Sequence, residues 1–197
     1  MTPRASQAMQ NGRREQGFTV WLTGLSGAGK TTIAQLVGTE LERRGRLVEC
    51  LDGDVVRNHL SPGLGFSRAE RDENVARIAW MAARLTRHGA AVVAAVISPY
   101  EAARQRARAV VEEFGPFIEV LVDAPIAACA RRDVKGLYRR ALAGEVRGFT
   151  GISDPYERPE RPDLVVPTLD QEPGESARCV LDVLEERRLV VPARVEA

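Results

Sequence analysis

Short apolar segments alternate along the chain with stretches of helical spacing. The apolar segments are rich in Val, Leu and Ile and lack strict alternation with polar residues, which is typical of parallel strands buried on both faces. They cover residues 18–23, 47–51, 90–97, 117–122 and 163–166. Because helical patterns lie between them, the sequence predicts an α/β fold with a parallel sheet flanked by helices on both faces.

The first two predicted helices have recognisable ends. Apolar side chains recur at helical spacing over residues 30–44, and Gly45 follows the last of them. The second helix covers 67–88 and opens with Ser67 and Glu70. This spacing is that of a capping box, in which each side chain accepts a hydrogen bond from the backbone of the other residue.

A second Ser-x-x-Glu pattern lies after the third apolar segment. Ser98 with Glu101 predicts that Ser98 caps a helix running to about Phe114. A further helix is predicted to begin near Pro125, and the last covers roughly 174–188. With these helices, the alternation of strand and helix extends almost to the end of the chain.

The alternation breaks over residues 132–162, which contain no strand pattern and many glycines and prolines. A long irregular insertion in a compact domain is usually functional or disordered. Its start is basic: residues 131–147 hold six basic side chains against two acidic ones. A basic insertion jointed by glycines is what a lid over a negatively charged substrate requires. We expect one domain over 17–191, with a flexible tail at 1–16 and another at 192–197.

Composition excludes several classes of function. The chain has 197 residues, and its 28 basic against 27 acidic residues favour neither a nucleic acid nor a membrane as partner. Two histidines and three widely spaced cysteines leave no pattern for a metal site, and the cysteines are interpreted as small buried side chains. No apolar run is long enough to span a bilayer and no secretory signal is visible, so a cytoplasmic location is expected.

The segment GLSGAGKT at 24–31 matches the phosphate-binding pattern G-x-x-x-x-G-K-[ST], between a predicted strand and a predicted helix. Its glycines let backbone N–H groups close around phosphate oxygens. Lys30 is expected to bridge the β- and γ-phosphates, and the Thr31 hydroxyl is expected to bind Mg²⁺. The sequence therefore predicts a site for a nucleoside triphosphate.

Two carboxylates follow the second predicted strand, in the segment LDGDVVR. Asp52 and Asp54 lie at the carboxyl edge of the sheet, where ligands bind in such folds. One can orient Mg²⁺ or its water, while the other accepts a proton from an attacking hydroxyl. The alternative for Asp54 is a structural role as the N-cap of the helix that follows.

The residues after Asp54 point to an anionic acceptor. Arg57 lies one helical turn further on, and Arg71 and Asn74 share a face at the start of 67–88. Paired guanidinium groups are strong ligands for oxyanions, although Arg71 can equally lie at a solvated helix end. Phe149, in the glycine-flanked part of the insertion, suggests stacking on a base, with a loop-anchoring role as the alternative.

With these pieces in order, the chain resembles the adenylylsulfate kinase family over residues 18–170. The resemblance rests on the series GLSGAGKT, DGDVVR, LGFSRAERDEN, ISPY, RDVKGLY and GFTGISDPYE. It implies a P-loop kinase fold with a lid at about 132–162. It also implies ATP-dependent phosphorylation of the 3′-hydroxyl of adenosine 5′-phosphosulfate (APS), which yields 3′-phosphoadenosine 5′-phosphosulfate (PAPS) and ADP in sulfate activation.

By match of position, the resemblance implies roles for individual residues. ATP is expected on Gly24, Leu25, Ser26, Gly27, Ala28, Gly29, Lys30, Thr31, Thr32 and Arg132. APS is expected on Asp54, Arg57, Phe66, Arg71, Asn74, Ile97, Ser98, Lys135, Leu137, Phe149 and Thr150. Mg²⁺ is expected on Thr31 and Asp52, and the catalytic positions are Lys30, Asp52, Asp54 and Ser98. Lys30 and Lys135 are the only lysines, and Lys135 resembles the lysine of the family's lid, which contacts the sulfonucleotide.

Some points stay open at this stage. The family's serine at the position of Ser98 has been assigned as a phosphoserine intermediate, but no base for it is visible in the sequence, and direct in-line transfer is favoured. Val55 and Ser153 depart from the usual pattern beside matched residues. The resemblance suggests a homodimer and allows a sulfurylase partner. The alternatives are another small-molecule P-loop kinase, acting on a sugar acid, shikimate or a nucleoside monophosphate, and a regulatory nucleotide-binding module.

Overall fold

A computed structural model of the chain describes residues 15–133 and 135–192, so most of both expected tails lies outside the described residues. A five-stranded parallel sheet forms the centre, in the order β2-β3-β1-β4-β5. The strands are β1 (Phe18–Thr23), β2 (Val48–Asp52), β3 (Ala91–Ala95), β4 (Phe117–Asp123) and β5 (Leu164–Pro167). All five predicted strands and the parallel α/β fold are confirmed.

The position of each strand in the sheet explains its burial. Central β1 and β3 are buried at every residue, because helices cover both faces and neighbouring strands cover both edges. At the sheet edge, β2 exposes Glu49 and Cys50. The expectation that every cysteine is buried is therefore wrong for Cys50, since edge strands are covered less completely than central ones. It holds for Cys129, while Cys179 is only partly buried.

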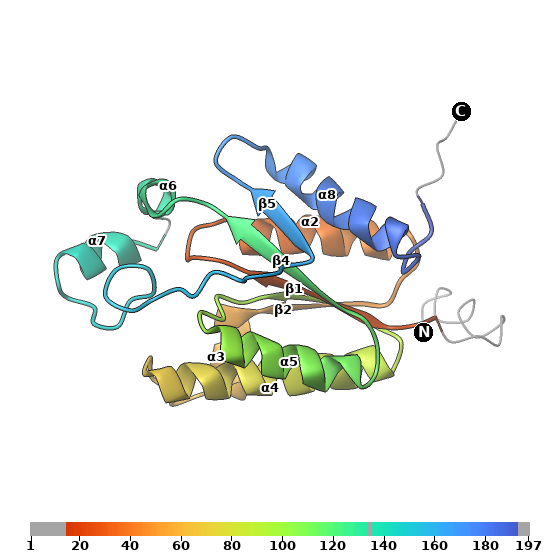
Figure 1. Cartoon of the computed structure of the whole chain (residues 1–197), viewed down its shortest axis with the longest axis horizontal. Helices are drawn as coiled ribbons and strands as arrows, with labels where there is room; N and C mark the ends of the chain where they lie inside the picture. The colour runs from red at the N-terminus through yellow and green to blue at the C-terminus, as the bar shows by residue number, and fades with distance from the viewer. Residues whose placement is uncertain (1–14, 134, 193–197) are drawn as a thin grey trace.

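The helices lie in two layers on the faces of the sheet (Figure 1). One layer consists of α2 (Lys30–Arg43) and α8 (Pro173–Glu186), and the other of α4 (Arg68–Arg87) and α5 (Glu101–Glu112). The short α3 (Gly53–Leu60) packs on α4 and β2. Across the part of the chain that the structure describes, no helix is long and apolar enough to cross a membrane.

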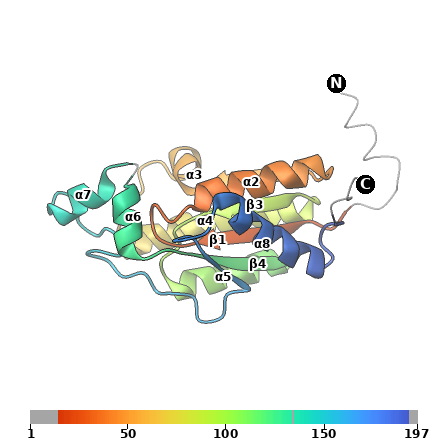
Figure 2. The same cartoon turned by 90° about the horizontal axis from the view of Figure 1, so that it is seen from above.

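Two short helices, α6 (Ile126–Arg132) and α7 (Leu137–Leu142), lie beyond one end of the sheet in both views (Figures 1 and 2). The prediction of an irregular segment over 132–162 therefore needs correction at α7. This helix buries only Tyr138 and Ala141, which are three residues apart, and it begins after Gly136 in the left-handed conformation. So short an apolar pattern is too weak to mark a helix in a sequence.

Of the two capping boxes predicted from the sequence, one is present in the structure and the other is absent. The box of Ser67 and Glu70 is confirmed at the start of α4. Ser98 caps no helix: α5 begins after Tyr100, and the Glu101 N–H instead donates to the Glu157 carboxylate at 2.7 Å. Ser98 has a φ of 40°, which is incompatible with the extended N-cap conformation.

The capping alternative for Asp54 is also wrong. The N-cap of α3 is Asp52, whose side chain accepts from the N–H groups of Asp54 and Val55 at 2.9 and 3.4 Å. Asp54 lies in the first turn of α3 with its side chain exposed. Its carboxylate is therefore not consumed by helix capping.

Candidate active site

The phosphate loop, residues 24–29, connects β1 to α2 at the carboxyl edge of the sheet. Two glycines give the loop its shape. Gly29 has a φ of 107° immediately before Lys30, and Gly24 has a φ of 150°. A Cβ on Gly24 would lie 2.4 Å from the carbonyl oxygen of Val122 on β4, so only glycine fits.

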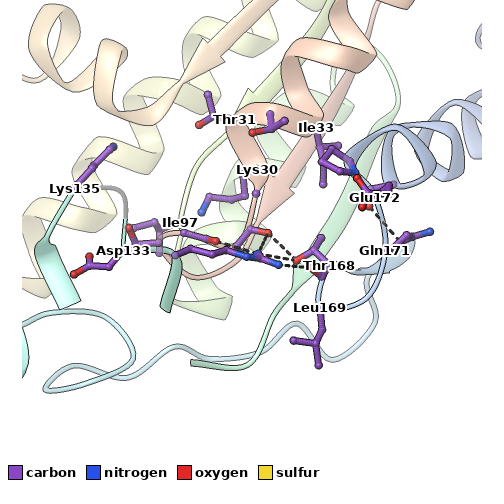
Figure 3. A pocket seen from close by; sticks show the side chains of 18 of the residues that line it. Lys30, Thr31, Ile33, Ile97, Asp133, Lys135, Thr168, Leu169, Gln171 and Glu172 are labelled. Atoms are coloured by element: carbon purple, nitrogen blue, oxygen red, sulfur yellow. Dashed lines mark hydrogen bonds between the residues drawn. The ribbon is translucent and has the colours of Figure 1, made fainter. Parts of the chain in front are cut away.

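Lys30, the first residue of α2, is 8% exposed, and its side chain turns back into the loop (Figure 3). Its Nζ donates to the carbonyl oxygens of Gly24 and Leu25, both at 2.8 Å. Burial lowers the pKa of Lys30 to about 8, and the nearby carboxylates of Asp52 and Asp54 oppose this shift. The loop thus holds a desolvated cation where a phosphate can bind.

This pKa predicts the pH dependence of nucleotide binding. Only the protonated ammonium attracts a triphosphate, so affinity is expected to be full below pH 8 and to fall as pH rises through the lowered pKa. The fall is at most about tenfold per pH unit, because one proton is involved. Titration calorimetry with a non-hydrolysable ATP analogue between pH 7 and 9.5 measures it. A wild-type affinity that stays flat across this range would contradict the assignment.

Beside Lys30, a hydroxyl and a carboxylate form a pair of oxygen ligands. Thr31 Oγ1 donates to Asp52 Oδ2 at 2.7 Å, while Asp52 Oδ1 caps α3. Both groups are of the hard-oxygen type that suits Mg²⁺. Within the described residues, no cluster of three or more His, Cys, Asp or Glu side chains could hold a metal alone. The pair therefore fits a Mg²⁺ ion that takes its other ligands from phosphate and water.

A pocket of about 740 Å³ extends from the phosphate loop to residues 168–173, the segment after β5. In Figure 3, Thr168, Gln171 and Glu172 lie on one side of Lys30, and Asp133 and Lys135 lie on the other. Arg132 closes one wall, since its guanidinium donates to the carbonyls of Gly27, at 3.2 Å, and Thr168.

Sequence reasoning named the loop residues and Arg132 but missed the wall at 168–173. The signal available was position alone, because this segment directly follows β5 at the same edge of the sheet as the phosphate loop.

A second pocket of about 100 Å³ meets the first at Lys30 and Ile97, which line both. It contains most of the residues expected to bind the acceptor: Asp54, Arg57, Arg71, Asn74, Ile97 and Ser98, together with Asp52, which was expected to serve Mg²⁺. They come from the ends of β2 and β3 and from α3 and α4. Four further expected residues line neither of these two pockets: Phe66, Leu137, Phe149 and Thr150.

The smaller pocket is suited to an anion. Arg57 and Arg71 both lie over the exposed ring of Phe66, at 4.3 and 5.5 Å from its centroid. Burial, followed by the charge of Arg71, lowers the pKa of the Arg57 guanidinium, so the two cations repel each other without a ligand. Asn74 is 7% exposed, and within the described part of the chain its Oδ1 has no hydrogen-bond partner. A ligand with anionic and hydrogen-bonding groups meets both needs.

Ser98 forms part of the floor of this pocket, but its hydroxyl is already engaged. Ser98 Oγ accepts from Trp21 Nε1 at 3.1 Å and donates to Thr23 Oγ1 at 3.0 Å, and the residue is 1% exposed. The buried Arg104 donates to the Ser98 carbonyl oxygen at 2.7 Å. These contacts hold Ser98 in its left-handed conformation, which costs a non-glycine residue about 1–3 kcal/mol.

The segment after α6 reaches both pockets. Lys135 lines the larger one and forms an ion pair with Asp54 across its mouth. On α4, Arg71 links the residues beside two aromatic side chains, because its guanidinium donates to the carbonyl oxygen of Phe66, at 2.8 Å, and to that of Gly148, the residue before Phe149. Phe149 follows Gly148 and is half-buried. The residues that sequence motifs place far apart therefore converge on one end of the sheet.

Comparisons with known proteins agree with this arrangement. The sequence profile of the family described as adenylylsulphate kinase matches residues 16–167. An adenylyl-sulfate kinase of Synechococcus sp. (strain JA-3-3Ab) is 57% identical over 173 residues, 88% of this chain and 96% of that protein. The chain belongs to the adenylylsulphate kinase family. It is accordingly a kinase with a P-loop kinase fold.

Two further relatives place the chain within the family. An adenylyl-sulfate kinase of Halothermothrix orenii is 51% identical, over 89% of this chain and 93% of that protein. Among solved structures, the APS kinase CysC of Mycobacterium tuberculosis, in complex with AMPPNP and APS, superposes with a TM-score of 0.84 at 45% identity. The match covers 86% of this chain and 98% of that one.

Proposed function

We propose that this kinase transfers the γ-phosphoryl group of ATP to the 3′-hydroxyl of APS, giving PAPS and ADP. The observation that carries the proposal is the meeting of two pockets at Lys30, one over the phosphate loop and one lined by two aspartates and two arginines. In-line transfer requires such an arrangement, because donor and acceptor must approach from opposite sides of the transferred group.

On the donor side, ATP would lie in the larger pocket with its phosphates on the loop and its nucleoside towards residues 168–173. Lys30 would turn from the carbonyls of Gly24 and Leu25 to the β- and γ-phosphates. Arg132, already against the loop, would lie over the nucleotide. The solved relative with an ATP analogue supports this binding mode.

Thr31 and Asp52 would hold Mg²⁺, Thr31 directly and Asp52 directly or through water. When bound, the ion neutralises charge that develops on the phosphate oxygens. Asp52 also caps α3, and this fixes its carboxylate beside Thr31. The hydrogen bond between the two side chains keeps their oxygens together.

On the acceptor side, Arg57, Arg71 and Asn74 would bind the phosphosulfate and ribose of APS. Asp54, exposed at the start of α3, would accept the proton of the 3′-hydroxyl. Lys135 would leave Asp54 for the sulfonucleotide, since a compact ammonium can change partners easily. Phe66 and Phe149, joined through Arg71, would flank the adenine of APS.

The decisive experiment compares ATP consumption with Mg²⁺ in the presence and absence of APS. We expect strong dependence on APS and a 3′-phosphorylated product, with turnover of about 1–100 s⁻¹. Shikimate, gluconate and AMP serve as control acceptors. Consumption with one of these, or ATP hydrolysis indifferent to any acceptor, would overturn the proposal.

Ser98→Ala tests whether transfer is direct. Its hydroxyl is buried among Trp21 and Thr23, and neither of these can act as a base, so we propose that Ser98 shapes the floor and carries no phosphoryl group. Losing its hydrogen bonds is expected to reduce kcat less than about tenfold. Ser98→Gly is the matched control, because glycine accepts a φ of 40° while lacking the same hydroxyl. A loss on the order of 10⁴-fold in both variants would instead indicate a covalent intermediate.

Arg71→Ala tests the acceptor site. We expect the KM for APS to rise about 10- to 100-fold with little change in the KM for ATP, because a lost charge-assisted hydrogen bond costs about 1.5–3 kcal/mol. Arg132→Ala is the counterpart and should raise the KM for ATP instead. Steady-state kinetics with each substrate varied in turn measures both, and equal effects of Arg71→Ala on the two substrates would contradict its placement.

Three further expectations stay predictions. A homodimer and an association with a sulfurylase that supplies APS come from the family resemblance, and a cytoplasmic location comes from the sequence alone. Size-exclusion chromatography with light scattering tests the first of these directly.

A further inference from the structure

Tyr138 is the one aromatic side chain of the exposed helix α7, and it is 1% exposed. Its neighbours Arg139, Arg140 and Leu142 face solvent. A six-residue helix beyond the end of the sheet has little core of its own in which to bury a ring. Tyr138 instead reaches the main hydrophobic core beside Cys129, and two of its contacts there join different parts of the active site.

The first contact is with the phosphate loop. The Tyr138 hydroxyl donates to the carbonyl oxygen of Ser26 at 2.9 Å. Because burial raises the pKa of this phenol above its ordinary value, the hydroxyl keeps its proton and stays a donor. The peptide between Ser26 and Gly27 is planar, so a bond that fixes its oxygen also fixes the direction of the Gly27 N–H. That N–H belongs to the loop that would cradle phosphate.

Arg132, six residues before Tyr138, binds the next two carbonyls of the phosphate loop. Arg132 Nη1 donates to the carbonyl oxygens of Gly27 and Ala28 at 3.2 and 3.4 Å. Arg132 and Tyr138 together therefore bind three consecutive carbonyls of the phosphate loop. Asp133 links Arg132 to Tyr138, since it follows Arg132 in the chain and its Oδ1 accepts from the backbone N–H of Tyr138 at 3.0 Å.

The second contact is with the acceptor side. The rings of Tyr138 and Phe149 meet edge to face, with centroids 4.9 Å apart and planes at 81°. Such a contact is directional, so it restricts the orientation of the Phe149 ring as well as its position. Phe149 lies in a tight loop whose N–H groups at Ile152, Ser153 and Asp154 all donate to its carbonyl oxygen. The backbone of this loop is fixed by its own hydrogen bonds, whereas the Phe149 ring packs on the main core and against the edge-to-face ring of Tyr138.

We propose that Tyr138 is a positioning residue that couples the phosphate loop to the aromatic ring that stacks on the acceptor base. The inference rests on the function proposed above. A nucleotide that orders the Ser26–Gly27 peptide also orders Tyr138, and through it the Phe149 ring. APS therefore binds more tightly when the nucleotide site is filled. By linkage, the nucleotide binds more tightly by the same factor when APS is present.

Tyr138→Phe tests the coupling, because it removes the bond to Ser26 and keeps the ring against Phe149. Calorimetry measures the Kd of APS for the free protein and for protein saturated with a non-hydrolysable ATP analogue. The ratio of the two values is the coupling factor. Typical coupling factors are about 5–150-fold, and we expect the wild type to fall in this range and Tyr138→Phe to fall below about twofold.

Tyr156→Phe is the matched control. It removes the hydroxyl of another, half-buried tyrosine, which bonds Thr23 Oγ1 at 3.0 Å rather than a carbonyl of the phosphate loop. Its coupling factor is expected to equal that of the wild type, even if it lowers thermal stability. A double-mutant cycle with Phe149→Leu tests whether the coupling passes through the Phe149 ring. In the Phe149→Leu background, Tyr138→Phe should not change the coupling factor further.

The outcomes separate the two proposals. If the wild type does not bind APS, or consumes ATP regardless of it, the proposed function fails. If the wild type binds APS and its coupling factor survives in Tyr138→Phe, or is absent from the wild type, the function stands and the role of Tyr138 is wrong. Equal loss of coupling in Tyr156→Phe would also overturn it, since any buried phenol would then have the same effect.

Discussion

Replacing Lys30 with methionine is expected to reduce kcat/KM on the order of 10³-fold while leaving the fold intact. The variant removes the cation that would neutralise the transferred phosphoryl group, in a buried site where such charges act most strongly. Methionine fills a similar volume, and because Lys30 lines both pockets, water can reach the carbonyls of Gly24 and Leu25 in place of the ammonium. Single-turnover kinetics with Mg²⁺ and APS measures the loss.

The thermal stability of Lys30→Met distinguishes a lost catalytic group from a misfolded protein. The pKa of Lys30 falls from 10.5 to about 8 in the folded protein, so the charged form costs about 3 kcal/mol at neutral pH. A lowered lysine pKa makes this cost fully present below pH 8, and the cost fades as pH rises towards 10.5. Lys30→Met removes it, so its Tm at pH 7 should equal or exceed that of the wild type.

Two results would contradict this account of Lys30. One is a variant that keeps a tenth or more of the wild-type kcat/KM. The other is a Tm at pH 7 that falls by many degrees, because the lost activity would then follow from lost structure. Lys30→Arg is the control for charge alone: it keeps a cation but its planar fork cannot reproduce the compact ammonium, and it should also be impaired.

The sheet could be predicted from the sequence because its strands are buried on both faces. Strands β1, β3 and β4 are mostly apolar segments without strict alternation, and their position in the chain gives the alternation of an α/β fold. The phosphate loop could be predicted because its chemistry depends on backbone geometry encoded in a few adjacent residues. In both cases the pattern that gives the prediction lies within a short stretch of sequence, although the strands it marks pair with distant partners.

The predictions of helix caps and of an irregular segment at 132–162 were wrong where a residue distant in sequence determines the local structure. The Ser98 hydroxyl had the right spacing for a cap, but Trp21 and Thr23, 77 and 75 residues away in sequence, engage it instead. Either Asp52 or Asp54 could have capped α3, and the choice depends on Thr31 holding Asp52 at the end of β2. Burial of Tyr138 beside Ser26, 112 residues away, had no signal in the local pattern of α7. These residues lie at the site, where function overrides local preference.

The two aspartates can be separated by substituting each with asparagine and varying Mg²⁺. Asp52→Asn keeps an oxygen to accept from the Asp54 N–H, so the cap of α3 survives, but it loses the charge beside Thr31. We expect kcat at moderate Mg²⁺ to fall on the order of 10³-fold, because the ion that stabilises the transferred group is lost. Higher Mg²⁺ should recover part of this loss. The apparent Mg²⁺ affinity in the presence of ATP is the quantity to measure.

Asp54→Asn is the matched variant, two residues away on the same helix start. Asp54 is the proposed base, so this substitution should lower kcat by about 10²–10⁴-fold at every Mg²⁺ concentration. It should leave the apparent Mg²⁺ affinity unchanged. If Mg²⁺ rescues Asp54→Asn and not Asp52→Asn, the two roles are exchanged. If neither variant loses activity, the hydroxyl is activated by position alone, as a loose phosphoryl-transfer transition state permits, and Asp52 then serves only as the cap of α3.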